Sequence, residues 1–262
     1  PTICGLRRRG YTPASIRNFS VRNGVSKVNS TVEYSFLEHC LREDLNLTAK
    51  RVMGVLNPVK LILTNYPEDR TETFEVENNP NRPEDGTRTV TFGRELYIEA
   101  EDFMETPVKG YFRLFPGNEV RLKTTYVVKC TGCKKDANGN VTEITASYDP
   151  ETRGGNFEGR KIKSTIHWVD AKNAEDAEIR LYDNLLTVED PDAGDFLELL
   201  NPDSLKVLTG CKVEASLKTA KPGESFQFMR QGYFCVDNKD SAEDHLVFNR
   251  SVSLKDGFKK KK

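Results

Sequence analysis

The segment VKLILTNY, residues 59–66, decides the fold class, because apolar side chains recur along it with a period of about two. This period is typical of a β-strand with one buried face. From Pro58 onward it returns in runs of β-branched and aromatic residues, separated about every ten residues by Gly, Pro, Asn or Asp. Such a pattern predicts an all-β sandwich or barrel, and the roughly 200 residues that follow Pro58 suffice for two small barrels.

Strands are expected in nine runs along this region: 59–66, 71–76, 94–103, 119–130, 141–148, 163–170, 177–186, 224–237 and 246–254. Asn138-Gly139 predicts a hairpin turn between the fourth and fifth runs, because both residues tolerate positive φ. Two stretches interrupt the pattern, NNPNRPEDG at 78–86 and YDPETRGGNFEGRK at 148–161. The second is the better candidate for a domain boundary or a mobile loop.

Helical signals are confined to the residues before this region. Thr12 is a good N-cap and Gly24 can end a helix in the left-handed region, which predicts a helix over 13–23. A capping box, a serine followed three residues later by a glutamate, begins at Ser30 and precedes apolar residues at helical spacing. It predicts a second helix over 31–45.

The composition is that of a globular protein, with 39 basic and 40 acidic residues, 37% hydrophobic residues and a net charge of −1. No run approaches the roughly 20 apolar residues of a membrane span, and no signal segment opens the chain. We therefore expect a cytoplasmic protein with no membrane partner. Its six cysteines stand at irregular spacings, which favours reduced, mostly buried thiols over a disulfide framework.

The near-neutral total hides a strong charge asymmetry. Residues 1–28 hold six basic residues and no acid: Arg7, Arg8, Arg9, Arg17, Arg22 and Lys27. Residues 183–198 hold six acidic residues and no base: Asp183, Glu189, Asp190, Asp192, Asp195 and Glu198. One surface can therefore attract a polyanion although the whole molecule does not.

Neither a metal site nor a catalytic site is predicted. Cys130 and Cys133 have the spacing of half a zinc knuckle, but no second pair of cysteines exists and no histidine stands at a matching spacing. His167, beside Trp168, is better explained as a satisfied or an exposed histidine than as a catalytic one. Phosphate-binding, dinucleotide-binding and nucleophile-elbow motifs are all absent.

Basic residues flanked by aromatic residues recur instead on the expected strands and turns. The three runs are KGYFR at 109–113, RLKTTY at 121–126 and QFMRQGYF at 227–234. Unpaired RNA bases stack on aromatic or guanidinium planes, and phosphates attract positive charge. The pattern is modest evidence for RNA binding, because an ordinary half-buried strand alternates in the same way.

Long phrases of the chain resemble a known family. They include PTICGLRRRGYTPASIRNF at 1–19, NPVKLILTNYP at 57–67, IHWVDAKNAEDAEIRLYDNLL at 166–186 and FQFMRQGYFCVD at 226–237. Together they resemble the C-terminal portion of bacterial-type glutaminyl-tRNA synthetases, which are class I aminoacyl-tRNA synthetases. The resemblance runs from Pro1 to about Phe258.

The resemblance implies a mainly β fold, in which a short α-helical connector precedes two anticodon-binding barrels of the ribosomal-protein-like type. The connector is expected at 1–50, the two parts of the barrels at 51–152 and 153–258, and a basic tail at 259–262. The barrels can interleave.

The family's catalytic chemistry is expected outside this chain. The resemblance places activation of glutamine with ATP and Mg²⁺ in an N-terminal Rossmann domain, whose HIGH-type and KMSKS-type motifs are absent here. We therefore expect no catalytic residue and no cofactor in this chain, and no ligase activity from it alone. The expected partners are that missing domain and a tRNA with a glutamine anticodon, not DNA, and the expected state is a monomer.

The resemblance also implies roles for individual residues in the barrels. Arg51 and Gln227 match the pair that reads the middle anticodon uridine. Arg113 and Arg230 match the contacts to the third base, a guanine. Three further residues match positions around the first base and its phosphate: Lys109, Arg121 and Lys123.

In the connector, the resemblance places four arginines against tRNA phosphates: Arg7, Arg8, Arg9 and Arg17. The alternative is that one or two of them form ion pairs within the protein and link the connector to the catalytic domain.

Two residues depart from the family pattern. Met229 stands where other members carry an acid, so it cannot orient Arg51 through a salt bridge. Phe112 stands where a lysine is common, and its ring either stacks on a base or is buried in the barrel. Two other identities stay open: the anticodon-binding region of a glutamyl-tRNA synthetase, and a free-standing β-barrel protein that binds RNA or another partner.

Overall fold

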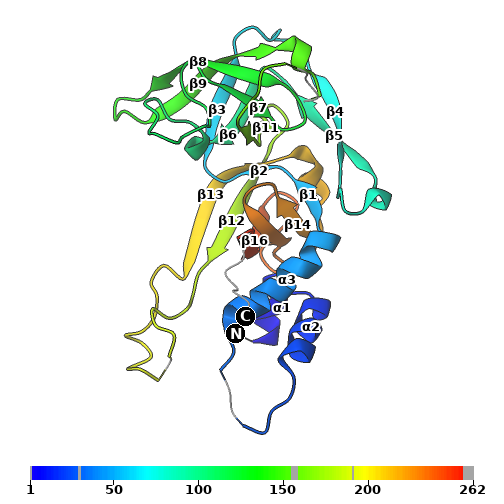
Figure 1. Cartoon of the computed structure of the whole chain (residues 1–262), viewed down its shortest axis with the longest axis vertical. Helices are drawn as coiled ribbons and strands as arrows, with labels where there is room; N and C mark the ends of the chain where they lie inside the picture. The colour runs from blue at the N-terminus through cyan, green and yellow to red at the C-terminus, as the bar shows by residue number, and fades with distance from the viewer. Residues whose placement is uncertain (1, 29–30, 155–158, 191, 256–262) are drawn as a thin grey trace.

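The protein is described by a computed structural model that covers residues 2–28, 31–154, 159–190 and 192–255. Strands hold 38% of the residues and helices 19%, and the two main sheets form a near-barrel and a half-barrel. The expectation of a mainly β fold with a short helical part is confirmed. Figure 1 shows the helices at one end of an elongated molecule, one sheet beside them and the other sheet beyond it.

The helical connector consists of α1 (Ile3–Arg8), α2 (Pro13–Asn23) and α3 (Tyr34–Thr48). Helix α2 has the predicted bounds, because the Thr12 hydroxyl accepts a hydrogen bond from the Ser15 amide and Gly24 ends the helix at φ 74°. Helix α3 begins later than expected, with Glu33 as an N-cap whose side chain makes no capping hydrogen bond. Ser30 lies outside the described residues. Helix α1 was not predicted.

We call the sheet next to the helices the proximal sheet. Its strand order is β1-β14-β15-β16-β12-β13-β2. The bounds are β1 Lys50–Val52, β2 Gly54–Val55, β12 Glu175–Tyr182, β13 Leu205–Val213, β14 Ser225–Phe228, β15 Gly232–Val236 and β16 Leu246–Ser253.

The distal sheet has the order β10-β7-β8-β9-β3-β6-β11. Its bounds are β3 Pro58–Leu63, β6 Glu95–Glu99, β7 Glu119–Leu122, β8 Val127–Lys135, β9 Val141–Asp149, β10 Thr165–Ile166 and β11 Val169–Asp170. Strands β4 (Glu72–Glu77) and β5 (Thr87–Phe92) form a separate antiparallel pair. Short 3-10 helices are η1 Pro83–Asp85, η2 Ala100–Asp102, η3 Pro150–Thr152 and η4 Ala215–Thr219.

The two sheets are interleaved in the sequence. The chain enters the proximal sheet through β1 and β2, builds the whole distal sheet, and then returns to complete the proximal one. Strand β1 thereby pairs in parallel with β14, about 175 residues later in the chain. Residues from both halves of the sequence consequently meet at the junction of the sheets.

Three of the expected strands are wrong in extent, because each is broken. The run 119–130 is a hairpin of β7 and β8 that turns at Thr124, with φ 71°. The run 224–237 is likewise a hairpin, which turns at Arg230 with φ 68°. The run 163–170 is divided into β10 and β11. Strands β1, β2, β5 and β13 were missed, whereas the predicted turn at Gly139 is present with φ 84°.

Each sheet encloses its own aromatic core. Trp168 and Phe92 are fully buried in the distal core, and their rings meet edge to face at 5.1 Å between centroids. Phe228 and Phe234 stack at 4.4 Å in the proximal core. Burying one such side chain contributes about 1.5–3 kcal/mol. A smaller third cluster, which includes Tyr233, packs the connector against the proximal sheet.

In the described part of the chain, no helix is both long and apolar enough to cross a membrane. All six cysteines are free and four of them are buried, as the spacing predicted.

Candidate nucleic-acid interface

Arg51 and Gln227 lie side by side on the proximal sheet. They are direct partners in the parallel pairing of β1 with β14, so their side chains leave the sheet on the same face. The flanking Phe226 and Phe228 point inward and are buried. Arg51 Nε and Gln227 Oε1 are buried atoms with no hydrogen-bond partner among the described residues. Such atoms favour a ligand that supplies the missing partners.

A cavity of about 330 Å³, which we call the central cavity, opens beside Arg51. Its lining also includes Met53, Arg88, Lys123 and Met229. Its size falls in the range of small-ligand pockets. Two of its cations, Arg51 and Lys123, form no ion pair with any described residue.

Met229 gives the central cavity an apolar wall at the position where the resemblance led us to expect an acid. The Arg51 guanidinium makes one side-chain hydrogen bond, at 3.4 Å from Nη2 to Asn46 Oδ1, and no described carboxylate pairs with it. The prediction that Met229 provides no salt bridge to Arg51 therefore agrees with the geometry. Asn46, at the end of α3, is the residue that contacts Arg51 in its place.

Arg113 and Arg230 meet on one buried carboxylate. The Asp102 side chain is fully buried, and Arg230 donates to both of its oxygens, at 2.6 Å and 2.7 Å. Arg113 Nη1 lies 2.9 Å from Asp102 Oδ1. Arg113 lies on the loop before β7 of the distal sheet, and Arg230 lies in the β14–β15 turn of the proximal sheet, so Asp102 joins the two sheets.

His167 continues this network into the protein. Arg230 can only donate, so the contact of 3.2 Å from its Nη1 makes His167 Nδ1 the acceptor. Nε2 then carries the proton and donates a hydrogen bond to Glu99, also at 3.2 Å. His167 is 1% exposed. It is thus the satisfied core histidine that the sequence favoured over a catalytic one.

Glu99 closes the network at the junction. Burial opposes its ionisation, but hydrogen bonds from His167 and from the amides of Leu56 and Asn57 hold the pKa of Glu99 below its ordinary value. Gln231 also donates to this carboxylate, at 2.5 Å. The junction between the sheets is therefore a hydrogen-bonded polar core, which holds the partly exposed Arg113 and Arg230 in fixed positions.

The three residues expected at the first base do not form one group. Arg121 lies on the outward face of β7, because its neighbours Val120 and Leu122 point into the core, and Lys123 is the first residue after the strand. Lys123 lines the central cavity with Arg51. Lys109 lies apart from that cavity, exposed on the loop between η2 and β7. Arg121 Nε is buried without a described partner.

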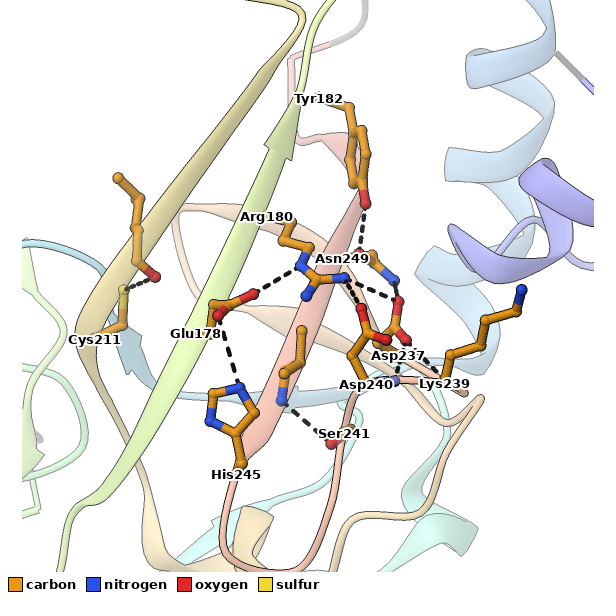
Figure 2. A network of polar contacts seen from close by, with 12 residues as sticks. Glu178, Arg180, Tyr182, Cys211, Asp237, Lys239, Asp240, Ser241, His245 and Asn249 are labelled. Carbon is orange, nitrogen blue, oxygen red and sulfur yellow. Dashed lines mark hydrogen bonds and ion pairs between the residues drawn. The ribbon is translucent and has the colours of Figure 1, made fainter.

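Arg8 is engaged inside the protein. Its Nε lies 2.8 Å from Asp237 Oδ2 and its Nη2 lies 2.7 Å from Asp240 Oδ2. Figure 2 shows the surroundings of the two carboxylates: Arg180 Nη1 contacts Asp240 at 2.6 Å, and Asn249 donates to Asp237 at 2.6 Å. The predicted alternative of an internal ion pair thus describes Arg8. Its partners, however, follow β15 of the proximal sheet, so the ion pairs link the connector to this sheet and not to a catalytic domain.

Arg9 is also held by the fold, whereas Arg7 and Arg17 are free. The Arg9 guanidinium lies 4.7 Å from the centre of the Tyr182 ring, and it donates to the Tyr34 hydroxyl at 3.2 Å. Arg7 and Arg17 are exposed and form no ion pair with a described residue. Arg9 forms no ion pair with a described residue either, but it is only partly exposed, so Arg7 and Arg17 are the two of the four arginines that are both unpaired and exposed.

Two family models match the chain, and both carry the description of the anticodon-binding domain of class I tRNA synthetases (E and Q). One matches residues 49–149 and the other residues 165–237. The chain belongs to this family. The alternative of a free-standing β-barrel protein from outside this family is therefore wrong.

Similar proteins point to one member of the family. The chain is 57% identical to a glutamine–tRNA ligase of Clostridium perfringens, over 100% of this chain and 48% of that protein. Ligases of the same name from Clostridioides difficile and Bradyrhizobium diazoefficiens are 55% and 52% identical, over 99% of this chain and 47% of each protein. The chain spans about half the length of these relatives and matches their C-terminal half.

Sequence reasoning missed Asp102, which organises two of the anticodon-binding candidates. It stands in the run EAEDF among other acids, and nothing local distinguishes it. The burial alternative for Phe112 is wrong, because its side chain is 53% exposed. The tail at 259–262 lies outside the described residues.

Proposed function

We propose that this chain is the anticodon-reading part of a glutamine–tRNA ligase, and that it selects tRNA with a glutamine anticodon. The observation that carries the proposal is the pairing of Arg51 with Gln227, with unsatisfied buried polar atoms in both side chains. The names of the relatives support glutamine over glutamate. The same proposal includes a cytoplasmic location and a monomeric state.

The middle uridine suits the Arg51 and Gln227 pair. A uridine edge presents two carbonyl acceptors on either side of one N–H donor. Gln227 Oε1 can accept from that N–H while its amide donates to one carbonyl, and the Arg51 guanidinium supplies donors for the other. Each atom left without a partner in the free protein thereby gains one.

The third base, guanine, suits Arg113 better than Arg230. Guanine presents the acceptors O6 and N7, which match a guanidinium fork. Arg113 spends only Nη1 on Asp102 and on the Glu101 carbonyl, and its side chain is 44% exposed. Arg230 gives both terminal nitrogens to Asp102. We propose that Arg113 contacts the base and that Arg230 positions Asp102.

Lys109, Arg121 and Lys123 are proposed to contact the first base and the phosphates of the anticodon. In the connector, the exposed Arg7 and Arg17 are proposed to contact the tRNA backbone, where unpaired positive charge displaces counterions.

Amino-acid activation with ATP and Mg²⁺ is proposed for the other half of the ligase. The described residues hold no group of three or more His, Cys, Asp or Glu placed to bind a metal ion, and the sequence has no phosphate-binding loop. These residues do not fit ATP or Mg²⁺, so no catalytic step is derived for this chain.

The test compares binding of the chain to tRNA carrying a CUG anticodon with binding to variants changed at one anticodon base. We expect Arg51→Ala and Gln227→Ala each to lower the preference for a central uridine by about 1–3 kcal/mol. Arg94→Ala, in a separate surface depression with Lys60, is the matched control. Wild-type preference in both site variants would refute the assignment.

A change of the third base to cytidine tests the choice between the amino acids, because glutamate anticodons end in cytidine. The glutamine proposal requires weaker binding of that variant, and equal or tighter binding would instead favour the glutamate enzyme.

A further inference from the structure

A second cavity, of about 510 Å³, lies on the distal side of the molecule and has no role in the contacts above. We call it the outer cavity. Its lining combines Tyr111 and Phe112 with three lysines, Lys129, Lys161 and Lys163. Aromatic rings beside cations are the elements with which proteins bind unpaired nucleotides.

Phe112 is presented to solvent by a loop that is held in place. The Tyr111 hydroxyl, on one side of Phe112, donates to the Glu101 carbonyl at 3.2 Å. On the other side, Asn118 donates to the Arg113 carbonyl at 2.7 Å, and Leu114 is fully buried. A large apolar ring that is 53% exposed on so fixed a loop is costly in the free protein and suits a stacking partner.

The charge of the outer cavity favours a phosphate. Lys163 Nζ lies 5.0 Å from the centre of the Phe112 ring. Neither it nor Lys129 nor Lys161 forms an ion pair with a described residue. The acid in the lining, Glu119, is neutralised by Arg160, with contacts of 2.5 Å and 2.9 Å.

Strand β7 connects this cavity to the central one. Its outward residues are Glu119, in the outer cavity, and Arg121, and the residue that follows the strand, Lys123, lines the central cavity. At a rise of about 3.3 Å per residue, the path is about 13 Å long. One RNA strand can therefore cross β7 and reach both cavities.

We propose that the outer cavity binds an unpaired nucleotide that none of the contacts above assigns. Its base stacks on Phe112, and its phosphates lie against Lys161 and Lys163. Because every base has an aromatic face, this subsite tolerates any base and adds affinity without discrimination. The inference rests on the proposed function, since the strand is placed by its middle anticodon base at Arg51, beside the central cavity.

The experiment uses the 262-residue chain and an RNA stem–loop that carries the CUG anticodon, with each loop base removed in turn to leave an abasic site. We expect Phe112→Ala to weaken binding about tenfold. One abasic position should weaken binding of the wild type by a similar factor but leave binding of Phe112→Ala almost unchanged. Phe112→Trp should restore the affinity, and Phe196→Ala, an equally exposed phenylalanine in the acidic segment 183–198, should bind like the wild type.

The lysines give an independent readout. Lys161→Ala with Lys163→Ala should flatten the dependence of log affinity on log salt by about 0.7 for each phosphate that the two lysines neutralise. Full affinity of Phe112→Ala, or a weakening that couples to no loop position, would overturn the inference. The proposed function has a separate test: it fails if the wild type does not distinguish CUG from an anticodon with a changed middle base. Because that comparison does not involve Phe112, its failure can be told apart from a failure of the present inference.

Discussion

Replacement of Asp102 by alanine should destabilise the junction of the two sheets more than any surface change. The substitution removes a fully buried carboxylate that contacts Arg230 at 2.6 Å and 2.7 Å and Arg113 at 2.9 Å. Breaking a buried ion pair from one side costs about 3–5 kcal/mol. The side chains of Arg230 and Arg113 are 30% and 44% exposed, so water can solvate part of the freed charge. We therefore expect the lower end, about 3 kcal/mol.

Urea unfolding measures this destabilisation as a lower midpoint with an unchanged slope. A double-mutant cycle with Arg230→Met isolates the pair, because the double variant should be destabilised by at least about 1 kcal/mol less than the two single variants together. Asp102→Asn, which keeps the shape, should lower the preference for guanine at the third base and leave the middle-base preference intact. A destabilisation below about 1 kcal/mol, or an equal fall of both preferences, would refute this role for Asp102.

Three further predictions follow from the contacts. Burial opposes ionisation of Asp237, but hydrogen bonds from its neighbours lower its pKa in the folded protein. Its contribution to stability is therefore present above about pH 4 and is lost as the pH falls toward the folded pKa. Asp237→Asn should remove part of the acid sensitivity of the wild type, measured in unfolding curves at stepped pH. Arg7→Gln with Arg17→Gln should reduce the salt dependence of tRNA binding by about 0.9 for each phosphate contact and leave the unfolding midpoint unchanged, and an unaltered salt slope would contradict their role. Gly54→Ala should cost about 1–3 kcal/mol in thermal unfolding, because the added Cβ would lie 2.6 Å from the Phe228 ring; an unchanged Tm would show that the ring can move.

The turns show how far the sequence predicts this fold. The hairpin at Gly139 is predictable, because its signal is local: the Asp136 carboxylate accepts from the Asn138 and Asn140 amides. The hairpins at Thr124 and Arg230 carry no such signal, and both residues adopt positive φ, which is unfavourable for their side chains. At Arg230 the ion pair with Asp102, 128 residues earlier in the chain, supplies the compensation. A periodicity argument cannot detect a partner at that distance.

The same limit applies to the arginine block that begins the chain. The sequence predicts a basic surface at residues 7–9, but Arg7 and Arg8 end helix α1 and Arg9 is its C-cap with helical dihedral angles, so successive side chains point about 100° apart and the three arginines cannot share one face. Arg8 points toward Asp237, 229 residues later in the chain, and forms an ion pair with it. Arg9 packs on Tyr182, whereas Arg7 remains exposed. The charge that attracts a polyanion is therefore smaller than the composition indicates. The remaining arginines of the block fix the connector to the sheet whose β1 strand carries Arg51, so that exposed Arg7 and the central cavity belong to one packed unit.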